Sequence, residues 1–249
     1  MENIFLENII NKKLINNSNI IDNAINGLQI KGKKLIKNIV IGVTLCQEII
    51  DFALLKNADA IIVHHGIFCK NDTFPIFGTK KKRLKKIINN NINLYAWHLP
   101  LDIHPRLGNN AQLANILSIK IYKIINPCIF FGKIKNSVNG KQLKQLLQKK
   151  INKKVIHFTS NYLEKKIKNI GLCTGSGHKF FELAIEEGID AFISGEASES
   201  TIYISKERNV DFYSAGHHAT EKGGILALGK WLKQKHSLNI DFFDFENPI

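Results

Sequence analysis

Residues 39–66, IVIGVTLCQEIIDFALLKNADAIIVHHG, are the stretch that decides the fold. Two short apolar runs, at 39–43 and 60–63, flank a helical pattern at 47–56. Strand, helix and strand in this order are typical of two parallel strands covered by a helix. The second run leads directly into a histidine pair at 64–65. The stretch therefore predicts an α/β fold with polar side chains leaving the end of a buried strand.

The same alternation of helical patterns and short Ile- and Val-rich runs continues along the rest of the chain. We predict two α/β domains with mostly parallel sheets covered by helices, one over 1–125 and the other over 126–249. The boundary falls near Asn126-Pro127. Because no low-complexity linker separates the halves, we expect them to share an interface.

The composition is that of a globular protein with an excess of lysine. Of 249 residues, 44% are hydrophobic and 22% charged, and the formal net charge is +14. Arginine occurs only at positions 83, 106 and 208, although arginine makes most bidentate contacts to phosphate and guanine. Lys, Asn and Ile are abundant along the whole chain, and we interpret the positive charge as part of this general composition. DNA is therefore only a weakly supported partner. The one basic cluster, at 80–86, predicts a solvated helix face.

The four cysteines are far apart and form no C-x-x-C pair, which argues against a thiolate zinc site and a disulfide framework. No apolar run is long enough to span a bilayer, and Glu2 stands where a signal peptide carries basic residues. We expect a cytoplasmic protein with no membrane partner.

Metal-binding types of side chain follow three of the predicted strands. His64 and His65 end the first, Asp102 lies in the polar segment after another, and His217 and Glu221 open the last long helix. Ligands in open α/β sheets gather beyond the carboxyl ends of the strands. Residues four apart on a helix share a face, so His217 and Glu221 are spaced as paired metal ligands.

Three histidines and two carboxylates exceed what a single ion needs, and two divalent ions sharing a bridging carboxylate fit the count. Imidazole and carboxylate suit Zn, Fe, Mn, Co or Ni, and the lack of thiolate argues against Cu(I). Taken singly, each piece has a structural alternative: a strand-end histidine, a surface ion pair and a turn-forming aspartate. Their recurrence at successive strand ends favours the metal site.

Residues 173–178 place Gly175 and Gly177 between a predicted strand and a predicted helix. This turn is either an anion site made of backbone N–H groups or an ordinary tight turn. The sequence contains neither a Walker A motif nor a full G-x-G-x-x-G with an acidic partner, which argues against ATP and dinucleotide binding.

The order of these motifs resembles the GTP cyclohydrolase I type 2 family, also described as dinuclear-metal-centre proteins, and is most similar to its short YbgI-type bacterial members. The resemblance covers essentially the whole chain. The segments that carry it are Asn26-Gly27-Leu28-Gln29, residues 63–66, 97–102, 108–114, 175–177, 194–196 and 216–225.

The resemblance implies two interlinked α/β domains with a two-metal site in the cleft between them, and a homohexameric ring. It implies the metal ligands His64, His65, Asp102, His217 and Glu221. The inserted central domain of longer members is missing here. Ser194 and His178 replace residues that are usually Thr and Gln in the family.

The expected function is metal-dependent hydrolysis of a nucleotide or related heterocycle, including damaged nucleotides, as in protection against DNA damage. A ring-shaped metal-binding scaffold without turnover, and a metallopeptidase or phosphoesterase, remain open as alternatives. Hydrolysis also needs a proton donor near the ions. His98 and Glu196 are the candidates, although His98 is equally suited to orienting a metal ligand.

Overall fold

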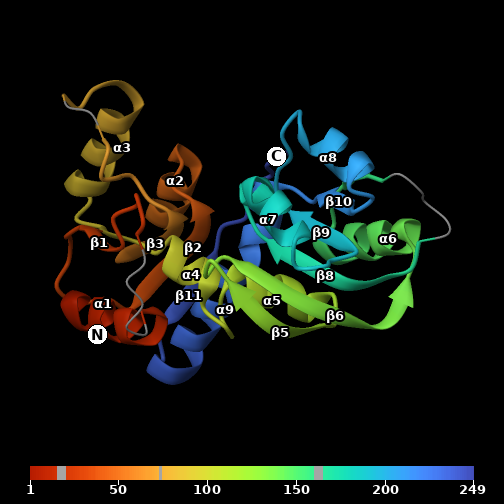
Figure 1. Ribbon diagram of the computed structural model, residues 1–249. Helices are drawn as coiled ribbons and strands as arrows, with labels where there is room; N and C mark the ends of the chain where they lie inside the picture. Colours follow the sequence, from red (N-terminus) through yellow and green to blue (C-terminus); the bar gives the residue numbers. More distant parts are fainter. Residues whose placement is uncertain (16–20, 73–74, 160–164) are drawn as a thin grey trace. The chain divides into compact units, whose positions relative to one another are not determined.

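The computed structural model describes residues 1–15, 21–72, 75–159 and 165–249, and divides into two compact units. Unit 1 comprises Met1–Leu101 with Ile225–Glu246, and unit 2 comprises Asp102–Gly224 with Asn247–Ile249. Each unit contains one β-sheet with helices packed against it (Figure 1). The predicted α/β fold with two helix-covered sheets is confirmed.

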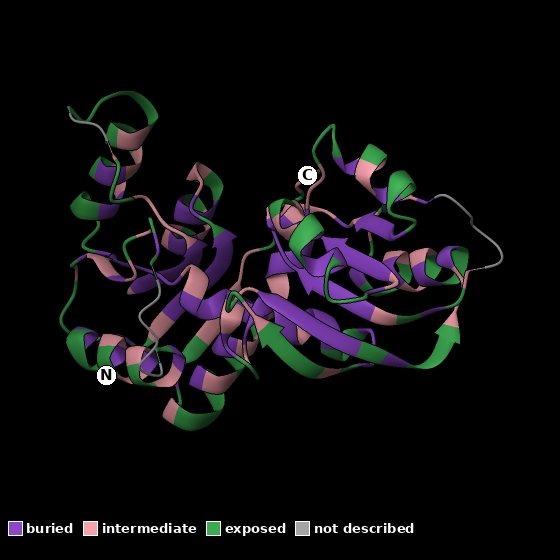
Figure 2. Cartoon of the chain, in the orientation of Figure 1, coloured by how far each residue is buried: buried purple, intermediate pink, exposed green. Residues whose placement is uncertain are grey.

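Unit 1 is built on a sheet with the strand order β1-β4-β3-β2-β11. The strands β4, β3, β2 and β11 run parallel, and β1 is antiparallel to β4. The first five residues of β3 are buried, as expected for a central parallel strand covered on both faces (Figure 2). The elements are α1 (Asn3–Leu14), β1 (Gly27–Ile30), β2 (Asn38–Thr44), α2 (Gln47–Leu55), β3 (Ala60–His65), α3 (Gly78–Asn89), β4 (Asn93–Ala96) and β11 (Asn239–Phe242).

Unit 2 is built on a sheet with the strand order β5-β6-β8-β9-β10-β7. The strands β8, β9 and β10 run parallel. The pairs β5–β6, β6–β8 and β10–β7 are antiparallel. The elements are α4 (Leu99–Ile103, which begins in unit 1), α5 (Asn109–Ile116), β5 (Ile119–Ile125), β6 (Ile129–Val138), α6 (Gly140–Ile151), β7 (Ile156–Phe158), β8 (Ile167–Cys173), the 3₁₀ helix η1 (Gly177–Phe180), α7 (Phe181–Ile185), β9 (Ala191–Ser194), α8 (Thr201–Glu207), β10 (Asp211–Ser214) and α9 (His217–His236, which ends in unit 1).

The second sheet is therefore mixed rather than mostly parallel. A short turn at Asn126, whose φ is 42°, joins β5 to β6. Strands joined by so few residues can pair only antiparallel, because a parallel connection needs a long crossover. The expected boundary at 125/126 falls between β5 and β6, which the structure pairs in one sheet.

The division of the chain also differs from a single boundary at 125/126. Residues 225–246 belong to unit 1, because α9 carries the chain back and β11 pairs with β2 in parallel, Ile240 opposite Ile39. Asp102 belongs to unit 2. Pairing between strands some 200 positions apart leaves no local pattern in the sequence. From the sequence we therefore assigned residues 239–242 to the second domain, together with the residues that precede them in the chain.

The two units repeat one structural detail. Asp59 precedes β3, and its Oδ2 accepts N–H bonds from Lys37 and Asn38 at 3.0 Å each, at the start of β2. In unit 2, Asp190 precedes β9 and binds the N–H groups of residues 168 and 169 at 2.9 and 2.8 Å, at the start of β8. In both units a carboxylate thus links the beginnings of two neighbouring parallel strands and holds their register.

Candidate metal centre

Three histidines gather at the carboxyl end of the unit 1 sheet. His64 and His65 end β3, and His98 follows β4; Val63 and Ala96 are partners in the parallel pairing of these strands. The ring centroid of His64 lies 4.5 Å from that of His65 and 5.0 Å from that of His98. One ring nitrogen of each histidine lies within 4.8 Å of the others. The structure thus adds His98 to the predicted pair.

Each of these rings is held through Nδ1. His64 Nδ1 lies 2.9 Å from the Trp97 carbonyl oxygen, which can only accept, so His64 carries its hydrogen on Nδ1. His65 Nδ1 lies 2.9 Å from Thr44 Oγ1, a hydroxyl that can take either role. A hydrogen on Nδ1 leaves the lone pair on Nε2, the arrangement found in metal-binding histidines.

Asp22 holds the third ring, and sequence reasoning missed it. His98 Nδ1 donates to Asp22 Oδ1 at 2.9 Å. The carboxylate also accepts bonds from Ala24 N, Asn26 Nδ2 and Leu99 N. Burial raises the pKa of Asp22, but the hydrogen bonds from His98 and Asn26 outweigh it and bring the pKa far below its usual range. Asp22 follows no predicted strand, so no local signal singled it out.

In unit 2, His217 and Glu221 lie on one face at the start of α9, as their spacing predicts. His217 Nε2 is 3.0 Å from Glu221 Oε2, and His217 Nδ1 is 2.5 Å from Glu196 Oε1. The hydrogen bond that His217 donates to Glu221 raises the pKa of His217 to about 9, against the effect of burial. A cation at this place would find the His217 nitrogen and the Glu221 oxygen 3.0 Å apart.

Gly175 shapes this pair. Its φ is 59°, and a Cβ at this position would lie 2.1 Å from Glu221 Oε1 and 3.2 Å from His217 Nε2. The Gly175 N–H donates to Thr220 Oγ1 at 3.1 Å, and the Thr174 N–H donates to Asn110 Oδ1 at 2.9 Å. These two N–H groups bind within the protein, so the turn makes room for the carboxylate, and the anion alternative gains no support from them.

Asp102 is the remaining candidate ligand, and only 7% of it is exposed. Its Oδ1 accepts a bond from Asn109 Nδ2 at 2.8 Å, and Asn109 Oδ1 accepts the Gly224 N–H at 2.7 Å. Asn109 therefore fixes the carboxylate of Asp102 to the backbone of α9.

The donor set is one of imidazole and carboxylate. Burial raises the pKa of the Cys173 thiol well above its ordinary value, so this buried cysteine is not a thiolate at neutral pH. Nitrogen and oxygen donors fixed by hydrogen bonds suit the divalent metals named above. The histidines and carboxylates of the two units therefore fit metal ions.

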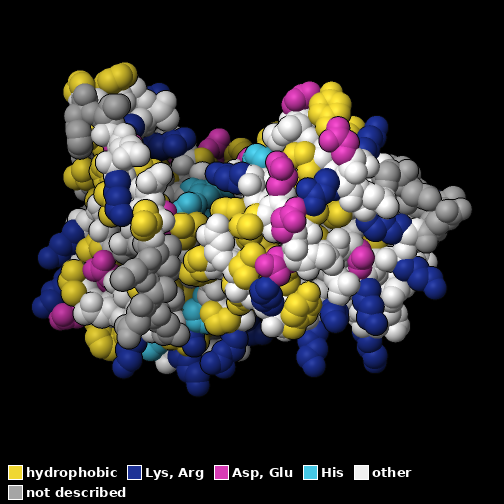
Figure 3. Space-filling view, in the orientation of Figure 1, with side chains coloured by type: hydrophobic (Ala, Val, Ile, Leu, Met, Phe, Trp, Pro, Cys, Tyr) yellow, Lys and Arg dark blue, Asp and Glu magenta, His cyan; other side chains and the backbone are white. Residues whose placement is uncertain are grey.

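On the face shown in Figure 3, positive charge is spread out instead of forming one patch. Lys and Arg side chains are scattered over the face shown in Figure 3. Within the basic cluster of α3, Lys80 pairs with Asp72 at 2.7 Å and Lys86 pairs with Asp51. Arg83 donates to the Leu45 carbonyl at 3.1 Å. Part of this cluster is thus occupied by partners within unit 1.

Among the described residues, no helix combines the length and the apolar character needed to cross a membrane.

Comparison with known proteins gives a consistent assignment. A model of the Duf34/NIF3 (NGG1p interacting factor 3) family matches residues 4–248. The chain is 50% identical to the "GTP cyclohydrolase 1 type 2 homolog" of Buchnera aphidicola subsp. Schizaphis graminum, and 46% identical to that of Haemophilus influenzae, with both chains covered completely in each comparison. The solved structure of protein ybgI is 45% identical with a TM-score of 0.96, and that of TTHA1606 from Thermus thermophilus is 28% identical with a TM-score of 0.84, again over 100% of both chains. The family resemblance inferred from the motifs is confirmed: the chain belongs to the Duf34/NIF3 family.

Proposed function

We propose that the protein is a dinuclear metal-dependent hydrolase that acts on nucleotides or related heterocycles, damaged nucleotides included. One observation carries the proposal: two of the proposed ligands, His64 and His217, each direct Nδ1 to an oxygen acceptor, at 2.9 and 2.5 Å. Fixing a histidine through Nδ1 orients its other nitrogen for a metal, which a histidine serving only the core does not need.

The proposed ligands of the two divalent ions are His64, His65, Asp102, His217 and Glu221. Imidazole and carboxylate ligands suit Zn, Fe, Mn, Co or Ni. When bound, such a pair supplies Lewis acidity and makes water a nucleophile at neutral pH. The protein's own part is to hold these donors rigidly, as Asn109 does for Asp102 and Gly175 allows for Glu221.

We assign proton transfer to His98. Asp22 holds the hydrogen on Nδ1, so Nε2 is the nitrogen that exchanges a proton with the leaving atom. Glu196 is the second candidate. Its Oε1 binds His217 Nδ1, and its Oε2 accepts the Ser176 hydroxyl at 2.9 Å, which supports a role in orienting His217.

The choice of substrate rests on the relatives. These relatives bear the name "GTP cyclohydrolase 1 type 2 homolog", which supports a purine nucleotide as the substrate class we propose. With it we propose a homohexameric ring in the cytoplasm. Light scattering of the purified protein tests the ring, since a mass near that of one chain, 28.2 kDa, contradicts it.

The function is tested with metal-supplemented protein, elemental analysis and mass spectrometry of purine nucleotides before and after incubation. We expect two ions per chain and consumption of at least one nucleotide. Two ions without turnover of any nucleotide would favour the scaffold, and cleavage of peptides or phosphodiesters alone would favour the other hydrolase classes.

Two variants separate the roles of His98 and Glu196. Loss of a proton-transfer group should lower turnover by about 10²–10⁴-fold with the ions retained. Loss of an orienting group should weaken metal affinity by about 10–100-fold. We expect the first result for His98→Gln and the second for Glu196→Gln; if neither variant changes turnover or affinity, both assignments are wrong.

A further inference from the structure

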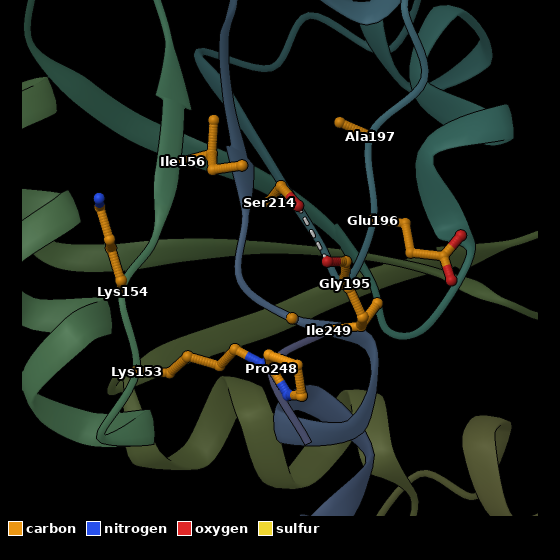
Figure 4. A pocket seen from close by; sticks show the side chains of 10 residues that line it. Lys153, Lys154, Ile156, Gly195, Glu196, Ala197, Ser214, Pro248 and Ile249 are labelled. Atoms are coloured by element: carbon orange, nitrogen blue, oxygen red, sulfur yellow. Dashed lines mark hydrogen bonds between the residues drawn. The ribbon is translucent and has the colours of Figure 1, made fainter. Parts of the chain in front are cut away.

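A cavity of about 340 Å³ opens in unit 2 at the ends of β9 and β10 (Figure 4). Gly195 and Gly216 form part of its wall, and each directly precedes a residue of the candidate site, Glu196 and His217 respectively. The cavity therefore lies beside the Nδ1 edge of His217, where Glu196 holds the ring. A ligand bound here would lie next to the proposed metal ligands without replacing any of them.

Charged groups of both signs surround the cavity. Figure 4 shows Lys153 and Lys154 on one side of it and Glu196 on the other. Glu196 directs its oxygens to His217 and Ser176. Among the described residues, neither lysine forms an ion pair with a carboxylate. Lys153 and Lys154 are therefore the cations in the cavity wall that an anionic ligand would meet.

Lys153 is fixed rather than mobile. Its Nζ donates one of its three hydrogens to the Asn247 carbonyl oxygen at 2.8 Å. Its stem packs on Gly216, where a Cβ would lie 2.9 Å from Lys153 Cδ and Cε. Burial, and then the nearby Lys222 ammonium, lower the pKa of Lys153. An anion that binds in the cavity beside Lys153 would stabilise the charged form of this ammonium.

We propose that this cavity binds the phosphate group of a small phosphorylated molecule through Lys153 and Lys154. A phosphate dianion matches two lysines, which bind phosphate as point charges. Ile156 and Pro248 supply apolar surface for the part of the ligand next to the phosphate. If the protein is the proposed hydrolase, this ligand is its substrate, and that identification alone rests on the proposed function. Binding of phosphate in the cavity needs no metal.

The test uses the full chain after chelator treatment, titrated calorimetrically with inorganic phosphate and with pyrophosphate. Lys154→Met removes an exposed charge with little risk to folding, and Lys153→Met keeps the stem that packs on Gly216. Losing one charge-assisted contact should weaken phosphate binding by about tenfold or more. Lys149→Met and Lys150→Met are the matched controls, because these two exposed lysines lie in the last turn of α6 and do not line the cavity.

Weaker phosphate binding in both cavity variants, with the controls unchanged and melting temperatures equal, supports the site. No binding by metal-free wild-type protein, or equal affinity in Lys154→Met and Lys149→Met, overturns it. Binding that appears only after metal is restored, and is insensitive to the lysines, also overturns it, since phosphate then binds at the ions. Lysine-dependent binding in a protein that converts no nucleotide leaves the cavity site standing and removes the proposed function alone.

Discussion

At the residue scale, single atoms set the geometry of the candidate site. Gly175 is the clearest case: its positive φ and the 2.1 Å approach of Glu221 Oε1 to the Cβ position leave no room for a side chain. The motif Gly175-Ser176-Gly177 suggested either an anion site or an ordinary turn from its residues alone. The contact with Glu221 supplies a reason for glycine that the motif did not contain.

We expect Gly175→Ala to displace Glu221 and to reduce metal binding, which titration of the metal-free protein would measure. Gly188→Ala is the matched control, since Gly188 also has a positive φ, 72°, but nothing lies within 4 Å of its Cβ position. Both variants bear the cost of a left-handed alanine, about 1–2 kcal/mol. Equal metal affinity in the two variants would contradict the role of Gly175.

Asp22 offers a second test at this scale. Asp22→Asn removes the buried charge that holds His98 Nδ1–H, so we expect a changed tautomer equilibrium of His98 and lower turnover with the ions retained, as for His98→Gln. Nitrogen NMR of the imidazole rings reports the tautomer directly. Asp51→Asn, at an exposed carboxylate paired with Lys86, makes the same chemical change elsewhere. An unaltered His98 spectrum in Asp22→Asn would rule out the orienting role.

At the element scale, strand register depends on the aspartates that precede β3 and β9. Burial raises the pKa of Asp59. Hydrogen bonds from Lys33 and from the N–H groups at the start of β2 lower this pKa by more than burial raises it, so the net shift is downward. A carboxyl whose folded pKa is depressed stabilises the fold above its unfolded pKa of about 3.9, and the contribution is lost as pH falls through the folded value.

We therefore expect wild-type protein to lose more unfolding free energy than Asp59→Asn when the pH falls from 6 to below about 4. Denaturant titrations at a series of pH values measure the difference. Asp241→Asn serves as the control, because Asp241 is half exposed and, within the described ranges of the chain, pairs only with Lys56, at 3.7 Å. Parallel pH profiles for wild type and Asp59→Asn would show that the link between β2 and β3 does not depend on this charge.

At the scale of the whole molecule, the net charge of +14 is the property that most invites a nucleic-acid partner. Because the cations are scattered and several in α3 are paired within unit 1, we expect weak duplex DNA binding. It should be uniform over sequences and should collapse with added salt. Fluorescence anisotropy at low and physiological salt measures it; tight binding lost on neutralising residues 80–86 would reverse this view and promote the scaffold.

The sequence by itself determined the α/β class, the strand-end positions of His64 and His65, and the shared face of His217 and Glu221. These features depend on periodicity and spacing over a few residues, which the chain carries locally. Tertiary structure alone decided the pairing of β11 with β2, the assignment of Asp102 to unit 2, and the contact of Asp22 with His98. These features depend on residues that are tens to hundreds of positions apart. Burial of apolar surface in the core brings such residues together, and this leaves no repeating pattern in the sequence from which the contacts could be predicted.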